Sequence, residues 1–303
     1  MVQAVRWGEY GEMNPPGPDH PVQGGAVDDG AGLHPWSRYV ALGDSFTEGV
    51  GDPEPRSLGG LRGWADRVAE ELAIGHEDFA YANLAVRGLL LRQILDRQVC
   101  PALALKPDLI TFNGGGNDLI FRRSDPDKLA AVLDAGVELL ASTGATVVLF
   151  AGPDWGATPV LGRTRGKVAI FNENLRIIAA RHDAVIADLW ALRELTHPQM
   201  WDPDRLHFSP LGHHTIAAMV LDTLNVPHTL EPMTPKDLPE RRWREARADD
   251  ILWVREHLFP WVLQRLKQRI SEEERRTPKR PDVSTVFGAG MPPGTFIGNR
   301  PRK

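Results

Sequence analysis

The sequence predicts an α/β fold in which a parallel sheet is covered by helices on both faces. Five short apolar runs, each suited to a buried strand, lie at residues 39–42, 79–84, 109–112, 146–151 and 184–188. Stretches with helical spacing lie at residues 63–73, 89–99, 127–142, 168–181 and 211–224. Because strands and helices alternate, neighbouring strands are expected to run parallel, with a helix crossing between them.

The first 34 residues precede this pattern and show no hydrophobic period. They are rich in glycine, proline and acidic residues, which is typical of disordered segments, so we expect a disordered arm at residues 1–35. They lack the apolar core of a signal peptide, and no run of about 18 apolar residues could span a membrane. We therefore expect a cytoplasmic protein without a transmembrane segment, whose main domain covers residues 36–226.

The first strand leads into the sequence VALGDSFTEGVG at residues 40–51. Aspartate and serine favour turns and helix N-caps. The side chain of Asp44 is therefore expected to accept backbone N–H groups of the turn and so to hold it. A serine at the carboxyl end of a parallel strand is also well placed for chemistry, because sites in such sheets lie beyond these ends. Ser45 is therefore a candidate nucleophile.

Three further polar blocks follow along the chain. NLAVRG ends the second strand region at residues 83–88, GGGND follows the third strand at residues 114–118, and DRLH precedes the last helix at residues 204–207. That helix is well marked, because Ser209 is a good N-cap and Pro210 suits the first helical position. We expect Arg87 to be a surface or ion-pair residue and Asp118 to support its turn.

The composition changes again beyond residue 226. Prolines at positions 227, 232, 235 and 239 mark a linker, and helical spacing follows, so we expect a linker and helical extension at residues 227–270. Residues 271–303 are charged and then rich in proline and glycine, and we expect a disordered tail there. Residues 265–303 hold ten basic and four acidic residues, which would allow peripheral membrane contact, although charge runs are usually solvated.

Charge and cysteine content exclude several classes of function. The net charge of −5 provides no overall field for nucleic acid. Cys100 is the only cysteine, so no intrachain disulfide can form, which fits a reducing compartment. His207, His213 and His214 with the nearby aspartates would suggest a metallo-phosphoesterase, but His213 and His214 are adjacent on a helix and point in different directions. We therefore expect neither a metal nor an organic cofactor.

The polar blocks supply the parts that acyl transfer needs, namely a nucleophile, a base, a group that orients the base, and oxyanion donors. His207 is the candidate base for Ser45, because histidine exchanges a proton near neutral pH. A carboxylate on the other ring nitrogen would fix the tautomer and stabilise the imidazolium. Asp204 is the candidate for this role, and Asp202 is the alternative.

The candidate oxyanion donors are the backbone N–H groups of Ser45 and Gly88 and the side-chain amide of Asn117. Glycine allows close approach of the backbone, and Asn117 follows three glycines. The nucleophile elbow of other serine hydrolases requires G-x-S-x-G, whereas Thr47 stands here at the second glycine. Trp155, in a loop-like segment after the fourth strand, is expected to form a wall of the acyl pocket.

These blocks resemble those of the SGNH hydrolases, or GDSL esterase/lipase family, named after a serine, a glycine, an asparagine and a histidine in four blocks. The matching residues, in order, are Gly43-Asp44-Ser45, Gly88, Asn117 in GGGND, and Asp204 with His207 as D-x-x-H. The resemblance covers about residues 36–224, with Phe46 in place of the leucine of the name. The sequences GDSFTEGVGD, YANLAVRG and DRLHFSPLGHH are similar to the actinobacterial branch. The resemblance implies a flavodoxin-like α/β/α sandwich and a three-donor oxyanion hole.

The sequence therefore predicts a serine esterase or lipase that hydrolyses a small-molecule, lipid or carbohydrate ester through an acyl-enzyme on Ser45. Two alternatives stay open. An acyltransferase would pass the same acyl group to an alcohol, and a non-catalytic binding protein would keep the scaffold without turnover.

Overall fold

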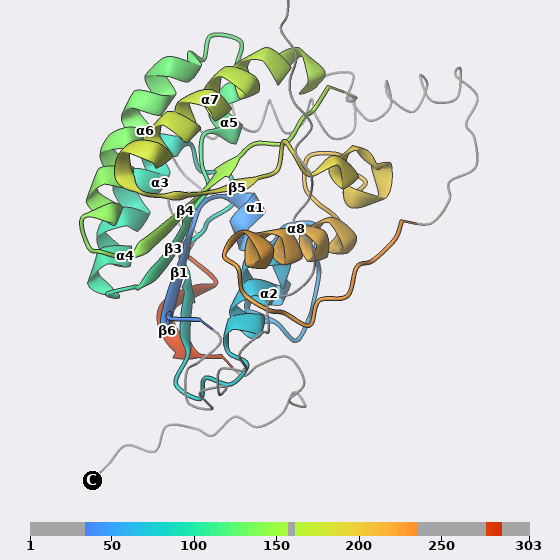
Figure 1. The fold of residues 1–303 in the computed structure, drawn as a ribbon. Coiled ribbons are helices and arrows are strands. Elements are labelled where there is room, and N and C mark those ends of the chain that lie inside the picture. Colours follow the sequence, from blue (N-terminus) through green and yellow to red (C-terminus); the bar gives the residue numbers. More distant parts are fainter. Residues whose placement is uncertain (1–33, 157–160, 236–276, 287–303) are drawn as a thin grey trace, which may run out of the picture. The chain divides into compact units, whose positions relative to one another are not determined.

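The computed structural model describes residues 34–156, 161–235 and 277–286, and a six-stranded sheet lies at its centre (Figure 1). The strands are β1 (Arg38–Leu42), β2 (Ala80–Asn83), β3 (Leu109–Phe112), β4 (Thr146–Ala151), β5 (Val185–Asp188) and β6 (Arg280–Thr285). Their order in the sheet is β5-β4-β3-β1-β2-β6, and the first five run parallel. The predicted parallel sheet is thus confirmed, with each of its strands within two residues of its expected ends.

Helices cover both faces of the sheet in the described part of the chain. They are α1 (Ser45–Glu48), α2 (Gly63–Leu72), α3 (Leu91–Ile94), α4 (Cys100–Ala104), α5 (Gly116–Leu119), α6 (Pro126–Ala141), α7 (Arg165–His182) and α8 (Pro210–Thr223). Helices α2 and α8 pack on one face, and α3, α4, α6 and α7 pack on the other (Figure 1). Short 3₁₀ turns lie at Leu58–Gly60, Leu161–Thr164, Arg193–Thr196 and Pro198–Met200.

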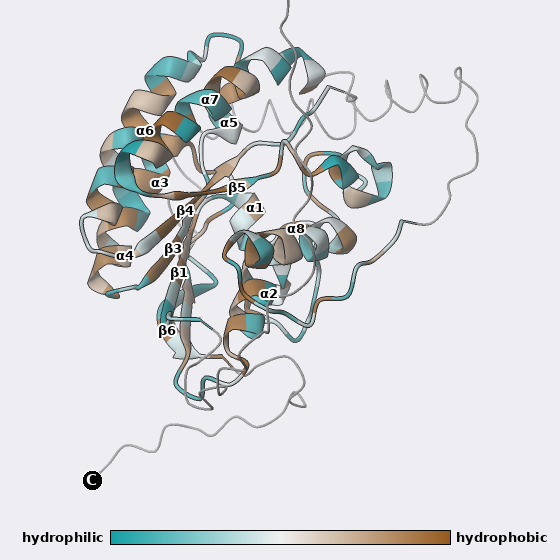
Figure 2. Ribbon diagram, viewed as in Figure 1, coloured by the Kyte–Doolittle hydropathy of each residue, from teal (hydrophilic) through white to brown (hydrophobic). Residues whose placement is uncertain are grey.

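The residues of β1 show how the two cores are divided. Tyr39 and Ala41 pack among the side chains of α2 and α8, and Val40 and Leu42 pack on the opposite face. All four are completely buried, as expected for a parallel strand covered on both sides. Figure 2 shows the corresponding distribution, with hydrophobic strands inside and hydrophilic residues on the outer sides of the helices. Among the described helices, none is long and apolar enough to cross a bilayer.

The helix expected at residues 89–99 continues further than the sequence predicts. It consists of α3, a π-helical turn at Leu95–Val99, and α4, which ends at Ala104. Pro101 stands in the first turn of α4. Proline normally ends a helix because it lacks an N–H and its ring crowds the preceding turn. The widened π turn directly before it changes the bonding pattern there, which lets the helix pass this residue.

Strand β6 lies in the segment that was expected to be a disordered tail, and that expectation does not hold for these residues. It pairs antiparallel with β2, whose other edge is paired with β1. An edge strand offers unpaired N–H and C=O groups to another segment, and Pro281 is tolerated in a strand at the edge. Lys279 fixes the entry to β6, because its buried ammonium pairs with Asp66 and donates to the carbonyl of Leu61 at 3.1 Å. The arm before residue 34 and the predicted helical extension beyond residue 235 lie outside the described residues.

Candidate active site

A cavity of about 120 Å³ opens at the carboxyl ends of the parallel strands. Ser45 lines it directly after β1, Asn117 lines it from the turn after β3, and His207 lines it from the loop before α8. The structure therefore brings together three of the predicted residues that are widely separated in sequence. The other two predicted residues do not line the cavity themselves. Asp204 binds the ring of His207, and Gly88 precedes Leu89, whose carbonyl binds the Asn117 amide.

The loop from Asp202 to His207 pairs a carboxylate with the imidazole. Oδ2 of Asp204 lies 2.5 Å from Nδ1 of His207, and Oδ1 accepts the N–H groups of Leu206 at 2.9 Å and His207 at 3.0 Å. Burial by itself raises the pKa of Asp204, but the hydrogen bonds and charge of His207 outweigh it and hold that pKa below its ordinary value. An ionised carboxylate only accepts hydrogen bonds, so Nδ1 carries the proton and Nε2 is left as the acceptor.

Asp202 takes a different part in the same loop. Its N–H donates to the carbonyl of His207 at 2.9 Å, and its carbonyl accepts the N–H of Arg205 at 2.8 Å. Arg205 has a φ of 52°, and this left-handed residue tightens the loop between the aspartate and the histidine. The geometry therefore favours Asp204 over Asp202 as the partner of the imidazole.

The turn that carries Ser45 is held by Asp44, as predicted. Asp44 caps α1, and its Oδ1 accepts the N–H of Phe46 at 3.1 Å. A Cβ on Gly43 would lie 2.4 Å from Oγ1 of Thr47, so the block requires a glycine there. The buried side chain of Gln98 also clamps Gly43, accepting its N–H and donating to its carbonyl, each at 2.8 Å. Gln98 could not be identified from the sequence, because it follows the polar residues Asp96 and Arg97 and nothing nearby marks its side chain as buried.

Ser45 and His207 line the same cavity, although no hydrogen bond joins their side chains in the described structure. Such contacts are often long in ligand-free active sites and tighten when substrate binds. Nε2 of His207 is the ring atom left available for the serine hydroxyl, because Nδ1 is bound to Asp204. The arrangement contains a hydroxyl, an imidazole whose Nδ1 is bound to a carboxylate, and that carboxylate in its ionised form, which are the parts of a serine triad.

The candidate oxyanion donors differ in how they are engaged. The backbone N–H groups of Ser45 and Gly88 have no acceptor within the described ranges. Gly88 has a φ of 92°, a left-handed conformation that glycine adopts without strain. The amide of Asn117 donates to Oδ2 of Asp44 at 3.1 Å and to the carbonyl of Leu89 at 3.0 Å. Asn117 therefore links the first two blocks, and an oxyanion would have to share one of its N–H groups.

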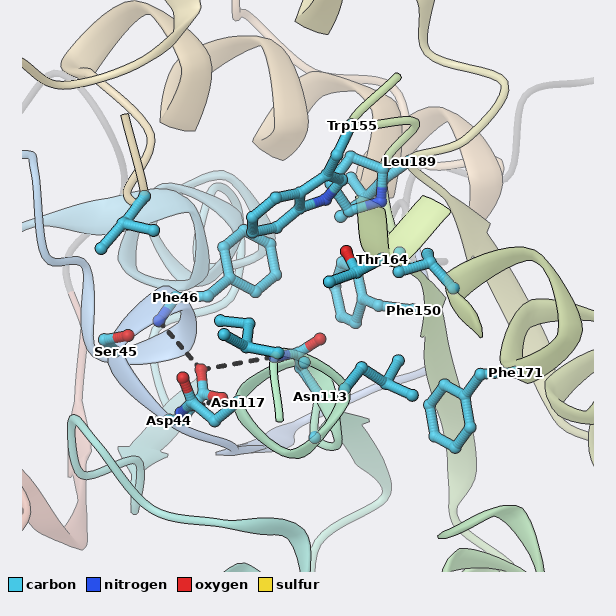
Figure 3. Close-up of a pocket in the computed structure, with 18 of the residues that line it drawn as sticks. Asp44, Ser45, Phe46, Asn113, Asn117, Phe150, Trp155, Thr164, Phe171 and Leu189 are labelled. Carbon is cyan, nitrogen blue, oxygen red and sulfur yellow. Dashed lines mark hydrogen bonds between the residues drawn. The ribbon is translucent and has the colours of Figure 1, made fainter. Parts of the chain in front are cut away.

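The rest of the cavity is mainly apolar and aromatic. Figure 3 shows Ser45 at one side and Phe171 at the opposite side, with Phe46, Phe150 and Trp155 around the space between them. The prediction that Trp155 forms a wall of the pocket is confirmed. No lysine or arginine occurs among the described residues that line the cavity. The cavity is therefore suited to an uncharged apolar group next to the serine.

His213 and His214 have separate partners, as expected for adjacent helical residues that point in different directions. His213 is fully buried, accepting the N–H of Trp64 on Nδ1 at 3.2 Å and donating from Nε2 to the carbonyl of Val50 at 3.1 Å. Burial lowers the pKa of His213 to about 4, so it is neutral at physiological pH. Nε2 of His214 lies 2.8 Å from the carbonyl of Glu231. Within the described ranges, no three or more His, Cys, Asp or Glu side chains are grouped as a metal site would need.

Comparison with known proteins agrees with the fold described above. Residues 41–215 match the model of the GDSL-like lipase/acylhydrolase family. TesA has 21% sequence identity and a TM-score of 0.52, over 62% of this chain and 97% of its own. The lipase/acylhydrolase from Enterococcus faecalis has 22% identity and a TM-score of 0.51, over 65% and 99%. Axe2, an acetylxylan esterase from Geobacillus stearothermophilus, has 18% identity and a TM-score of 0.53, over 65% and 98%. At these identities the likeness shows a shared fold, and no curated protein sequence matches significantly.

Proposed function

The chain belongs to the GDSL-like lipase/acylhydrolase family, and from this premise we propose that it is a serine esterase that hydrolyses carboxylic esters through an acyl-enzyme on Ser45. The observation that carries the proposal is the contact of 2.5 Å between Asp204 and His207 beside the cavity that Ser45 lines. A loop with a purely structural role would not need an ionised carboxylate on Nδ1 of an imidazole that shares a cavity with a serine.

The first half of the reaction forms the acyl-enzyme. Nε2 of His207 takes the proton of the Ser45 hydroxyl while Oγ attacks the ester carbonyl. The carboxylate of Asp204 keeps the proton on Nδ1 and stabilises the imidazolium that results. The tetrahedral intermediate collapses, and the leaving alcohol takes the proton from His207.

The negative oxygen of the intermediate is stabilised by the three donors. The N–H groups of Ser45 and Gly88 have no acceptor among the residues that the structure describes, and Asn117 supplies the third donor from its shared amide. Donors fixed before the reaction do not have to reorganise when charge develops, which is why such holes contribute strongly to the rate. In the second half, His207 activates a water that hydrolyses the acyl-enzyme.

Hydrolysis of nitrophenyl esters tests the proposal directly. Wild type should release nitrophenol, Ser45→Ala should retain only background activity, and a chelator should have no effect. Activity that survives in Ser45→Ala, or that is lost with chelator, would contradict the serine mechanism. Product analysis with an added alcohol distinguishes hydrolysis from acyl transfer.

A further inference from the structure

Gly88, one of the proposed oxyanion donors, follows a residue that is held through both its backbone and its side chain. The backbone N–H of Arg87 donates to Oε2 of Glu48 at 2.5 Å. The guanidinium donates to Oε1 of the same carboxylate, from Nε at 2.9 Å and from Nη2 at 2.5 Å. Charge-assisted bonds of this kind are roughly twice as strong as neutral ones.

Glu48 and Ser45 belong to the same four-residue helix, α1. The Glu48 carboxylate therefore ties the loop before Gly88 to the helix that carries the nucleophile and its backbone N–H. The other side of Gly88 is also fixed, because the carbonyl of Leu89 accepts the amide of Asn117 at 3.0 Å. The peptide that presents the Gly88 N–H thus lies between two anchored neighbours.

We infer that Glu48 is a positioning residue, whose carboxylate sets the direction of the Gly88 N–H in the oxyanion hole. The inference rests on the proposed function. A solvated ion pair would be the simpler explanation, and such pairs contribute little to stability. Two observations separate Glu48 from that case: its side chain is only 14% exposed, and one of its oxygens is bound to a backbone N–H beside the donor.

The expected effect is on the transition state rather than on substrate binding. Removing a whole oxyanion donor lowers kcat by about 10²–10³. A donor that points in the wrong direction should lower kcat by a smaller factor. We expect Glu48→Gln to lower kcat by about tenfold and Glu48→Ala by up to about a hundredfold, with KM within about twofold. Arg87→Ala keeps the backbone bond to Glu48, so its loss should be smaller than that of Glu48→Ala.

Glu70 provides a matched control. It forms a comparable ion pair with Arg62, whose Nε donates to both of its carboxylate oxygens at 3.1 Å. The side chains of Glu70 and Arg62 are 25% and 33% exposed, and Glu70 lies on α2, outside the cavity lining. Glu70→Gln removes a similar charge and should leave kcat and KM within about twofold.

The experiment measures kcat, KM, melting temperature and inhibition by an alkyl boronic acid for wild type and these variants. A boronic acid forms a tetrahedral adduct with the serine, so its affinity should fall in parallel with kcat/KM in the Glu48 variants and stay unchanged in Glu70→Gln. Wild-type kcat in both Glu48 variants would overturn the inference. Equal losses of activity and melting temperature in the Glu48 and Glu70 variants would also overturn it, because they would indicate general destabilisation. Absence of any Ser45-dependent turnover in wild type would instead remove the proposed function, and this inference with it.

Discussion

The size of the cavity predicts which acyl chains the enzyme prefers. Its volume is about 120 Å³, and an apolar protein cavity of about 150 Å³ holds one benzene molecule. An acyl group of about four to six carbons therefore fits beside Ser45. The aromatic lining, and the absence of lysine or arginine among its described residues, disfavour a negatively charged acyl group.

The gain for each added carbon follows from the burial of apolar surface. One methylene moved from water into an apolar site contributes about 0.8 kcal/mol, which is about fourfold in kcat/KM. The four methylenes between acetyl and hexanoyl then contribute about 3 kcal/mol, or at most about 200-fold. Further methylenes would remain in water and add little.

A series of nitrophenyl esters from acetyl to dodecanoyl measures this dependence. Val168 provides the perturbation, because it lines the cavity from α7 and is only 7% exposed. Val168→Phe should fill part of the cavity, lower kcat/KM for hexanoyl by at least about tenfold, and leave acetyl nearly unchanged. A wild-type preference for acetyl, or a rise that continues to dodecanoyl, would refute the reasoning from cavity size. An unchanged hexanoyl preference in Val168→Phe would show that the chain binds elsewhere.

Three further predictions can be tested in the same protein. Asp204→Asn should lower kcat by about 10⁴, whereas Asp202→Asn should lower it much less; equal losses in steady-state kinetics would contradict the assignment of the orienting carboxylate. Asn117→Ala should lower kcat by about 10²–10³ at nearly constant KM, and a loss confined to KM would mean that the amide only binds substrate. The pKa of His213 is about 4 in the folded protein and 6.5 ordinarily, so as the pH falls between these values the unfolded chain binds a proton that the folded protein does not. Urea unfolding should therefore show wild type losing up to about 3 kcal/mol from pH 7 to pH 4, and His213→Gln losing less; parallel losses would contradict the argument.

Elements encoded by neighbouring residues could be predicted from the sequence. The last helix begins where its cap predicts, because Oγ of Ser209 accepts the N–H of Gly212 at 3.2 Å and Pro210 occupies the first helical position. Strand β6 could not be predicted, because its partner β2 lies about 200 residues earlier and Lys279 finds its counter-charge on Asp66 of α2. A short polar segment with a proline carries no local signal of such a partner.

The same distinction divides the candidate site into two parts. The pairing of Asp204 with His207 is self-contained, because one carboxylate binds both the backbone N–H and the ring of a residue three positions later. The D-x-x-H spacing therefore needs no distant partner to form this pair, and the structure was needed only to choose Asp204 over Asp202. The proposed oxyanion hole depends instead on contacts across the sequence, with Asn117 bound to Asp44, 73 residues away, and Arg87 bound to Glu48, 39 residues away.

This division explains why Glu48 and Gln98 could not be identified from the sequence. Glu48 binds Arg87 and Gln98 binds Gly43, and in each case the partner lies in a distant part of the chain. Neither residue therefore has a neighbour in the sequence that reveals its role. It also means that the two halves of the proposed catalytic machinery have separate supports. A change at Glu48 leaves every contact within the Asp204 loop in place, so it should alter the stabilisation of the oxyanion without altering the orientation of the base. The kinetics of such variants would therefore measure the contribution of the hole by itself.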